Sequence, residues 1–217
     1  HLRLLLDAMR AQSGEAVYWR AMPWVVCMTT TENQASPVAR VPELLRCPAL
    51  HFGVSAEPLC GPLDLRPWLH GAVKCYIPFR CPGPCRSVRF ETCGVCNVCP
   101  KCCGRGPGLG WIIGGGWSGP RATPSHPQWF RDLRNQAASA GAAFLFKQWG
   151  EWAPFYDRDI DDPDWRNVPK EDERTCRLNL DGGQGFHGER VVYFRRVGKH
   201  AAGRLLDGVE HSAFPQV

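Results

Sequence analysis

Several signatures that would assign a function directly are missing from this chain of 217 residues. No apolar run approaches the roughly 18 residues that a membrane-spanning helix needs, and no signal peptide is visible. The sequence has neither a P-loop nor an HExxH zinc motif, and it lacks the residue order of a Ser-His-Asp triad. These absences exclude the motif-defined nucleotide, metalloprotease and hydrolase sites, and they predict a cytoplasmic protein with no membrane partner.

A strong excess of charge is also missing. The formal net charge is +5, and it is spread thinly over the chain. The richest basic stretch contains Arg195, Arg196, Lys199, His200 and Arg204, and it is more typical of a solvated surface than of a phosphate-binding patch. The sequence therefore supports a nucleic-acid partner only weakly.

Cysteine, in contrast, is abundant and unevenly placed, because seven of the twelve cysteines lie between Cys81 and Cys103. Secreted disulfide frameworks spread their cysteines through a small domain, so this packing favours metal-bound or free thiols in a reducing compartment. The spacing of zinc ribbons and knuckles occurs at Cys81-x3-Cys85 and Cys99-x2-Cys102, and Cys93-x2-Cys96 competes as the second pair. We therefore predict a structural zinc ion with ligands drawn from Cys81, Cys85, Cys93, Cys96, Cys99 and Cys102.

Two alternatives to zinc stay open for this stretch. Cys93, Cys96, Cys99 and Cys103 have the ferredoxin spacing of an iron–sulfur cluster, although Gly104 stands where a proline usually follows. The other alternative is a loop without any bound metal. A zinc ion held by four thiolates has no open coordination position, so it would staple the loop rather than catalyse a reaction.

Apolar patterns predict four strands that are separated by helix-length connections. We expect strands at 24–31, 50–56, 109–114 and 142–146, and helices at 2–11, 38–46 and 126–140. Such spacing indicates an α/β fold of parallel βα units, since a hairpin needs only a short turn. Residues 150–190 look irregular, and we expect a strand at 191–194 and a helix at 199–206 to close the chain.

The Cys-rich stretch divides this pattern into three parts. Residues 1–73 hold the first βα units, 74–108 form a zinc-knuckle-like insertion, and 109–217 hold the remaining βα units and the C-terminal helix. The insertion lies between the second and third predicted strands.

Three of the predicted strands end in an ionisable residue, namely Glu32, Glu57 and Lys147. Ligands bind at the carboxyl ends of strands in parallel α/β folds, so we predict these three residues as catalytic. The remaining strand runs into glycines, and we predict cofactor-binding roles for Gly115, Gly116 and Ser118. The alternative for each residue alone is structural, and the glycines do not match the GxGxxG fingerprint of dinucleotide sites.

Five segments, taken in order, resemble one family: WVVCMTTTENQ (24–34), SAEPLCGPLDL (55–65), WIIGGGWSGPRATPSHPQWFRDLRNQ (111–136), AAFLFKQWGEW (142–152) and RVGKHAAGRLLDG (196–208). They resemble the phage-associated three-Cys-motif proteins, the family of gene products thirty-seven and sixty-eight. The resemblance implies a partial TIM-like barrel, radical chemistry that depends on S-adenosylmethionine and an iron–sulfur cluster, and a phage- or host-encoded partner protein.

Two departures from that family limit what the resemblance implies. The family's hallmark cysteines would lie upstream of this chain, and Trp117 stands where the pattern GGESGP has a glutamate. We therefore expect the chain to correspond to the C-terminal part of a radical-SAM-like enzyme that is inactive alone. The alternative is a zinc-stapled module that binds nucleic acid or protein without catalysis.

Overall fold

The computed structural model describes residues 25–45, 47, 49, 51–69, 108–161, 167–185 and 190–215. The helix expected at 2–11 and almost all of the insertion at 74–108 lie outside these described residues. Among the described helices, none is long and apolar enough to cross a membrane.

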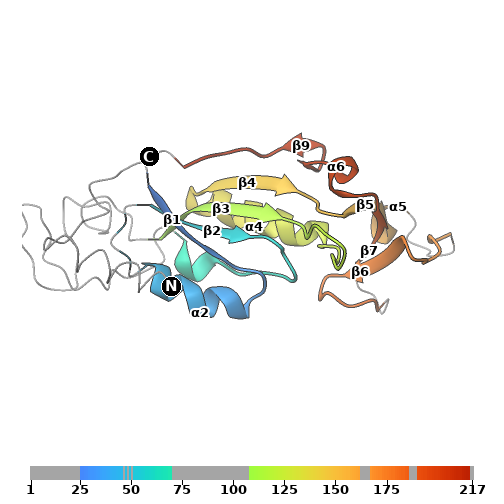
Figure 1. The fold of residues 1–217 in the computed structure, drawn as a ribbon, viewed down its shortest axis with the longest axis horizontal. Helices are drawn as coiled ribbons and strands as arrows, with labels where there is room; N and C mark the ends of the chain where they lie inside the picture. Colours follow the sequence, from blue (N-terminus) through green and yellow to red (C-terminus); the bar gives the residue numbers. More distant parts are fainter. Residues whose placement is uncertain are drawn as a thin grey trace, which may run out of the picture.

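The described part of the chain contains a parallel sheet, an antiparallel sheet and a short hairpin (Figure 1). The strands are β1 (Val26–Thr30), β2 (His51–Ala56), β3 (Leu109–Gly115), β4 (Ala143–Gln148), β5 (Trp152–Asp157), β6 (Thr175–Asn179), β7 (Val191–Arg196), β8 (Leu205–Leu206) and β9 (Val209–Glu210). The helices are α2 (Ala35–Leu45), the 3-10 helix η2 (Arg66–Trp68), α4 (Pro127–Ala140), α5 (Arg158–Asp161) and α6 (Lys199–Ala202).

The parallel sheet has the strand order β1-β2-β3-β4, which is also the order of the strands along the chain. Its registers pair Thr29 with Val54, Val54 with Ile112 and Ile112 with Phe144. The prediction of an α/β fold with a parallel sheet is therefore confirmed, and the described elements from β1 to β4 begin and end within a few residues of the expected bounds.

The two long helices contribute to one buried core with one face of the parallel sheet. The buried strand residues of this face include Val54, Ile112 and Phe146, and the ring of Phe130 in α4 lies 4.8 Å from that of Phe146. Val41 of α2 belongs to the same core. Residues that alternate to the opposite face are only partly buried, namely Met28, Ser55, Trp111, Ile113 and Leu145. The sheet is thus packed on one side and half open on the other.

Helix α4 has well-defined ends that follow from its sequence. Pro127 occupies the first turn, where a missing N–H costs nothing, and His126 caps the helix by accepting a hydrogen bond from the Gln128 N–H at 3.1 Å. Gly141 ends it in the left-handed region at φ +67°. The caps place the start of α4 near the carboxyl ends of β3 and β4 (Figure 1).

The expectation of an irregular stretch at 150–190 is wrong. Strands β5 and β6 lie within it, and both pair antiparallel with β7. This sheet lies beyond the end of the parallel sheet toward which β3 and β4 point (Figure 1). The expected helix at 199–206 is also too long, because α6 stops at Ala202 and Gly203 adopts φ +75°. The chain then forms the β8–β9 hairpin.

Candidate functional site

The carboxyl ends of the parallel strands bring together side chains from neighbouring βα units. The Glu57 carboxylate follows β2 directly, and its Oε2 accepts a hydrogen bond from Lys147 Nζ of β4 at 2.9 Å. We call Glu57 and Lys147 the rim pair. The Lys147 side chain is 53% exposed and that of Glu57 is 20% exposed, so the ammonium group faces solvent while the carboxylate is partly sheltered.

A β-bulge at the end of β4 accounts for the direction of Lys147. Gly114 pairs with Phe146, whereas the next residue, Gly115, pairs with Gln148, so Lys147 is an extra residue in its strand. Successive side chains normally point to opposite faces of a sheet. The bulge breaks that alternation, and both Lys147 Nζ and Gln148 Nε2 reach the Glu57 carboxylate, the latter at 3.1 Å.

Gly115 lets Glu57 reach across β3. Since neighbouring strands lie about 4.8 Å apart, a side chain from β2 must pass over β3 to meet β4. A Cβ atom added to Gly115 would lie 3.0 Å from Glu57 Cδ and 3.1 Å from its Cγ. The carboxylate therefore occupies the space that a side chain at residue 115 would take.

Gln148 fixes the position of the Glu57 carboxylate from the other side. Its side chain is buried, and its Nε2 also donates to the Gly116 carbonyl at 3.1 Å and to Ser118 Oγ at 3.2 Å. Its Oε1 accepts from the Gly150 N–H at 2.7 Å, which sets the orientation of the amide. Sequence reasoning missed this residue, because a buried amide has no spacing pattern of its own.

The structure accounts for Gly116 by backbone packing. A Cβ atom at this residue would lie 1.9 Å from the Trp149 carbonyl oxygen. The loops that follow β3 and β4 therefore touch through their backbones, and Gly116 belongs to that contact. Of the three residues predicted to bind a cofactor, Ser118 is joined to the rim pair through Gln148, and Gly115 lies beneath Glu57.

Glu32 is held within its own βα unit. Its carboxylate accepts hydrogen bonds from Ser36 Oγ at 2.7 Å and from Arg40 Nη1 at 2.9 Å, and Arg40 also contacts Thr30. Burial alone would raise the pKa of Glu32, but these hydrogen bonds outweigh it and lower the pKa to about 2. Among the described contacts, none links Glu32 to the rim pair, so the three predicted catalytic residues form a pair and a separate acid.

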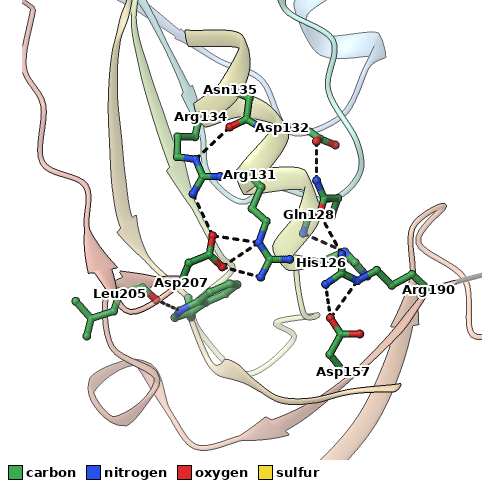
Figure 2. Close-up of polar contacts among 11 residues, drawn as sticks. His126, Gln128, Arg131, Asp132, Arg134, Asn135, Asp157, Arg190, Leu205 and Asp207 are labelled. Atoms are coloured by element: carbon green, nitrogen blue, oxygen red, sulfur yellow. Dashed lines mark hydrogen bonds and ion pairs between the residues drawn. The ribbon is translucent and has the colours of Figure 1, made fainter. Parts of the chain in front are cut away.

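A second polar cluster lies at the start of α4, and sequence reasoning missed it. Figure 2 shows Arg131 and Arg134 converging on Asp207, and it shows Arg190 beside His126. Arg131 Nη2 lies 2.6 Å from Asp207 Oδ1, and Arg134 Nη1 lies 3.0 Å from Asp207 Oδ2. Arg190 forms an ion pair with Asp157. We call Arg131, Arg134 and Asp207 the clamp, because it ties the turn of the β8–β9 hairpin to α4. The signal was the Asp207-Gly208 dipeptide, which is typical of a tight hairpin turn.

His126 is uncharged at neutral pH in this cluster. Burial, together with the positive charge of Arg190, lowers the pKa of its imidazole to about 4. The neutral ring keeps Nδ1 free to accept the Gln128 N–H. Protonation of that nitrogen would remove the cap of α4 and add a third positive charge beside two arginines.

The predicted zinc ligands from Cys81 to Cys102 lie outside the described residues. The described cysteines are Cys27, Cys47, Cys60 and Cys176, and all four are free thiols. Burial raises the pKa of Cys47 and of Cys176 to about 11, which disfavours the thiolate that metal binding needs. Within the described part of the chain, no three His, Cys, Asp or Glu side chains are grouped to hold a metal ion.

Comparisons with known proteins identify a family but no function. Searches of curated proteins and of solved structures each returned no match. One family profile, described as a protein of unknown function (DUF5131), matches residues 4–215. The match spans both sheets and the β8–β9 hairpin, and the chain belongs to the DUF5131 family.

Proposed function

We propose that this chain is the C-terminal part of a radical-SAM-like barrel enzyme, and that the rim pair binds the polar end of S-adenosylmethionine. The observation that carries the proposal is the convergence of Glu57, Lys147 and Gln148 on one point at the carboxyl end of a parallel sheet. Sites of α/β enzymes form at this end, because successive loops and strand ends meet there.

Two features of the sheet support a partial TIM-like barrel. The strands follow one another in chain order, as they do in a barrel, whereas doubly wound sheets reverse their order. Parallel sheets are usually covered on both faces, yet the face opposite α2 and α4 is only partly buried. In a barrel that face would be the interior, and the rim pair would lie at its mouth.

The charges of the rim pair suit a zwitterion. S-adenosylmethionine carries an ammonium and a carboxylate on one carbon, and these groups complement the Glu57 carboxylate and the Lys147 ammonium. Radical chemistry would also require an iron–sulfur cluster. The described cysteines do not fit such a cluster, so its ligands would have to come from outside the described residues. The described part therefore supplies binding and orientation alone.

Calorimetric titration of S-adenosylmethionine into the protein and its variants tests this proposal. Glu57→Gln and Lys147→Met should each weaken binding about tenfold, the range expected for one charge-assisted hydrogen bond. The control variant Glu171→Gln, which breaks the Arg177–Glu171 pair near β6, should bind as tightly as wild type.

A matched ligand sharpens the same experiment. Methylthioadenosine lacks the amino-acid group, so its affinity should not change in Glu57→Gln or Lys147→Met. The proposal is wrong if wild type does not bind S-adenosylmethionine at millimolar concentration, or if the two rim variants bind it as tightly as wild type does.

The second candidate function, a zinc-stapled binding module, is favoured by the cysteine spacing alone. The basic stretch lends it little support, because Arg195 stacks on Phe155 at 4.6 Å, Arg204 pairs with Glu210, and Arg196 donates to the Pro120 carbonyl. Elemental analysis of protein purified without oxygen should give about one zinc per chain and no iron. Iron with acid-labile sulfide would contradict the zinc prediction.

A further inference from the structure

The turn that follows β4 is tied to three segments of the chain through one residue, Glu151. Its backbone N–H donates to the Trp117 carbonyl at 2.9 Å, in the loop after β3. Its carbonyl accepts from the N–H groups of Val197 and Gly198 at 3.0 and 3.1 Å, just beyond β7. Its carboxylate Oε1 accepts from the Gly119 N–H at 3.1 Å. Glu151 therefore ties the loops of the parallel sheet to the antiparallel sheet.

Gly150 holds the same turn against the loop after β3 by backbone contact. It adopts φ +84°, which favours glycine, and a Cβ atom at this residue would lie 2.2 Å from the Trp117 carbonyl oxygen. The contact between Gly116 and Trp149 joins the same two loops. Hydrogen bonds and backbone packing thus fix the turn, and the direction of the Gly150 N–H is set with it.

Gln148 carries the position of this turn to the rim pair. A side-chain amide has an acceptor end and a donor end, and the Gly150 N–H occupies the acceptor end at 2.7 Å. The donor end then faces the Glu57 carboxylate, where Nε2 lies 3.1 Å from Oε1. The Gln148 side chain is buried, so water competes little for these bonds. The orientation of Glu57 is therefore set from the turn as well as by the exposed Lys147.

We propose that Gln148 is a positioning residue of the S-adenosylmethionine site: anchored through Glu151 to the end of β7, it holds the Glu57 carboxylate where the ligand's ammonium group binds. This inference rests on the proposed function, and it assigns Gln148 a role in affinity although the residue does not touch the ligand. Groups that bind a ligand must be held within roughly 0.5 Å of their productive positions, and hydrogen-bonded neighbours supply that constraint. The antiparallel sheet thus takes part in ligand binding through the turn.

Calorimetric titration of one substitution and its matched control tests this role. Gln148→Met keeps the length of the side chain but removes the donor to Glu57, and S-adenosylmethionine should bind about fivefold more weakly. Methylthioadenosine has no amino-acid group, so its affinity should not change. Gln136→Met is the control, because this amide of α4 also bonds two backbone groups, the Leu65 N–H at 2.7 Å and the Leu63 carbonyl at 2.8 Å. The control should bind both ligands as wild type does.

A second pair of variants tests the anchor. Glu151→Met removes only the carboxylate that accepts the Gly119 N–H, since the backbone bonds of Glu151 do not depend on its side chain. It should weaken S-adenosylmethionine binding about twofold. Glu151→Gln keeps an acceptor for the same N–H, and it should bind the ligand as tightly as wild type does.

A double-mutant cycle shows whether Gln148 acts through Glu57. In Glu57→Ala the carboxylate is gone, so adding Gln148→Met should not weaken S-adenosylmethionine binding further. Wild type, the two single variants and the double variant are also compared by urea denaturation without ligand. Each substitution breaks the same hydrogen bond between the two side chains, so together they should destabilise the protein by less than the sum of their separate effects.

The cycle without ligand separates this inference from the proposed function. If wild type does not bind S-adenosylmethionine, the proposed function is wrong, and the urea cycle alone decides whether Gln148 holds Glu57; additive destabilisation would refute it. Where the ligand binds, two results overturn the inference. A folded Gln148→Met protein binds S-adenosylmethionine as tightly as wild type does, or it loses affinity for methylthioadenosine by the same factor.

Discussion

The rim pair and the clamp are both ion pairs between segments far apart in sequence, yet they are built in opposite ways. The clamp binds one carboxylate with two arginines, and all three side chains are between 23% and 33% exposed. The rim pair leaves a lysine 53% exposed, and a bulge in β4 and a glycine in β3 make room for it. The clamp thus fastens a hairpin turn with partly buried charges, whereas the bulge and the glycine at the rim pair leave a charged group facing solvent.

The largest expected effect concerns the backbone beneath the rim pair. Gly116→Ala places a Cβ atom 1.9 Å from the Trp149 carbonyl, so two backbone loops must separate, and we expect a loss of at least about 3 kcal/mol in the free energy of unfolding. Gly115→Ala meets only the flexible Glu57 side chain, and this crowding should cost about 1 kcal/mol while weakening S-adenosylmethionine binding. Urea denaturation of both variants measures the difference, and equal losses would contradict this account.

The next effect is a dependence of stability on pH that arises from His126, which lies beside the clamp at the start of α4. The pKa of His126 is about 4 in the folded protein and 6.5 in its unperturbed state, so the unfolded chain takes up the proton first as pH falls. Stability should therefore decline by about 2 kcal/mol between pH 7 and pH 5. His126→Asn keeps a helix-capping side chain and should remove most of this decline. An unchanged decline in that variant would assign the pH dependence to other groups.

A smaller effect is expected from the clamp itself. Asp207→Asn removes the charge that binds Arg131 and Arg134, while asparagine still tolerates the left-handed backbone. The pairs are partly exposed, so we expect a loss of about 1 kcal/mol at low salt and less in about 1 M salt. Urea denaturation at both salt concentrations provides the measurement. A loss that does not depend on salt would indicate packing rather than charge.

The smallest effect on stability is expected at the rim pair. Lys147→Met removes an exposed ammonium group, and such pairs contribute little to stability, so we expect a change of no more than about 0.5 kcal/mol. The same variant should lose affinity for S-adenosylmethionine, and that contrast would separate a binding residue from a fastening one. A loss comparable to that of Asp207→Asn would instead make the rim pair a second clamp.

The parallel sheet could be predicted from the sequence because its signals are local. The apolar spacing from Trp129 to Ala137 defines α4, and Gly141 ends it in a conformation that glycine favours. Strands β5 and β6 could not be predicted in the same way. Each depends on pairing with β7, which lies tens of residues later for β5, and the prolines and aspartates around them obscure any alternation.

The residues of the candidate site also differ in whether a local sequence signal predicts them. Glu57 and Lys147 were predicted because each follows an apolar strand, and the structure places them in contact. Gln148 was missed, since its role depends on the Gly150 N–H and on two other loops that fold beside it. The sequence does not identify Asp207 as part of a cluster because the pattern at 199–206 predicts a helix, although Asp207-Gly208 is a strong hairpin signal.

The bulge at Lys147 makes the length of β4 a determinant of the site. Removing Lys147 would make the Gly114–Phe146 and Gly115–Gln148 pairs consecutive, so regular pairing with β3 would be restored and the residues after the deletion would keep their partners. An ammonium group would then be lost from the mouth of the sheet without any change in its core. A deletion of one codon would therefore remove both the lysine and the bulge that presents it, whereas a substitution would remove the lysine alone.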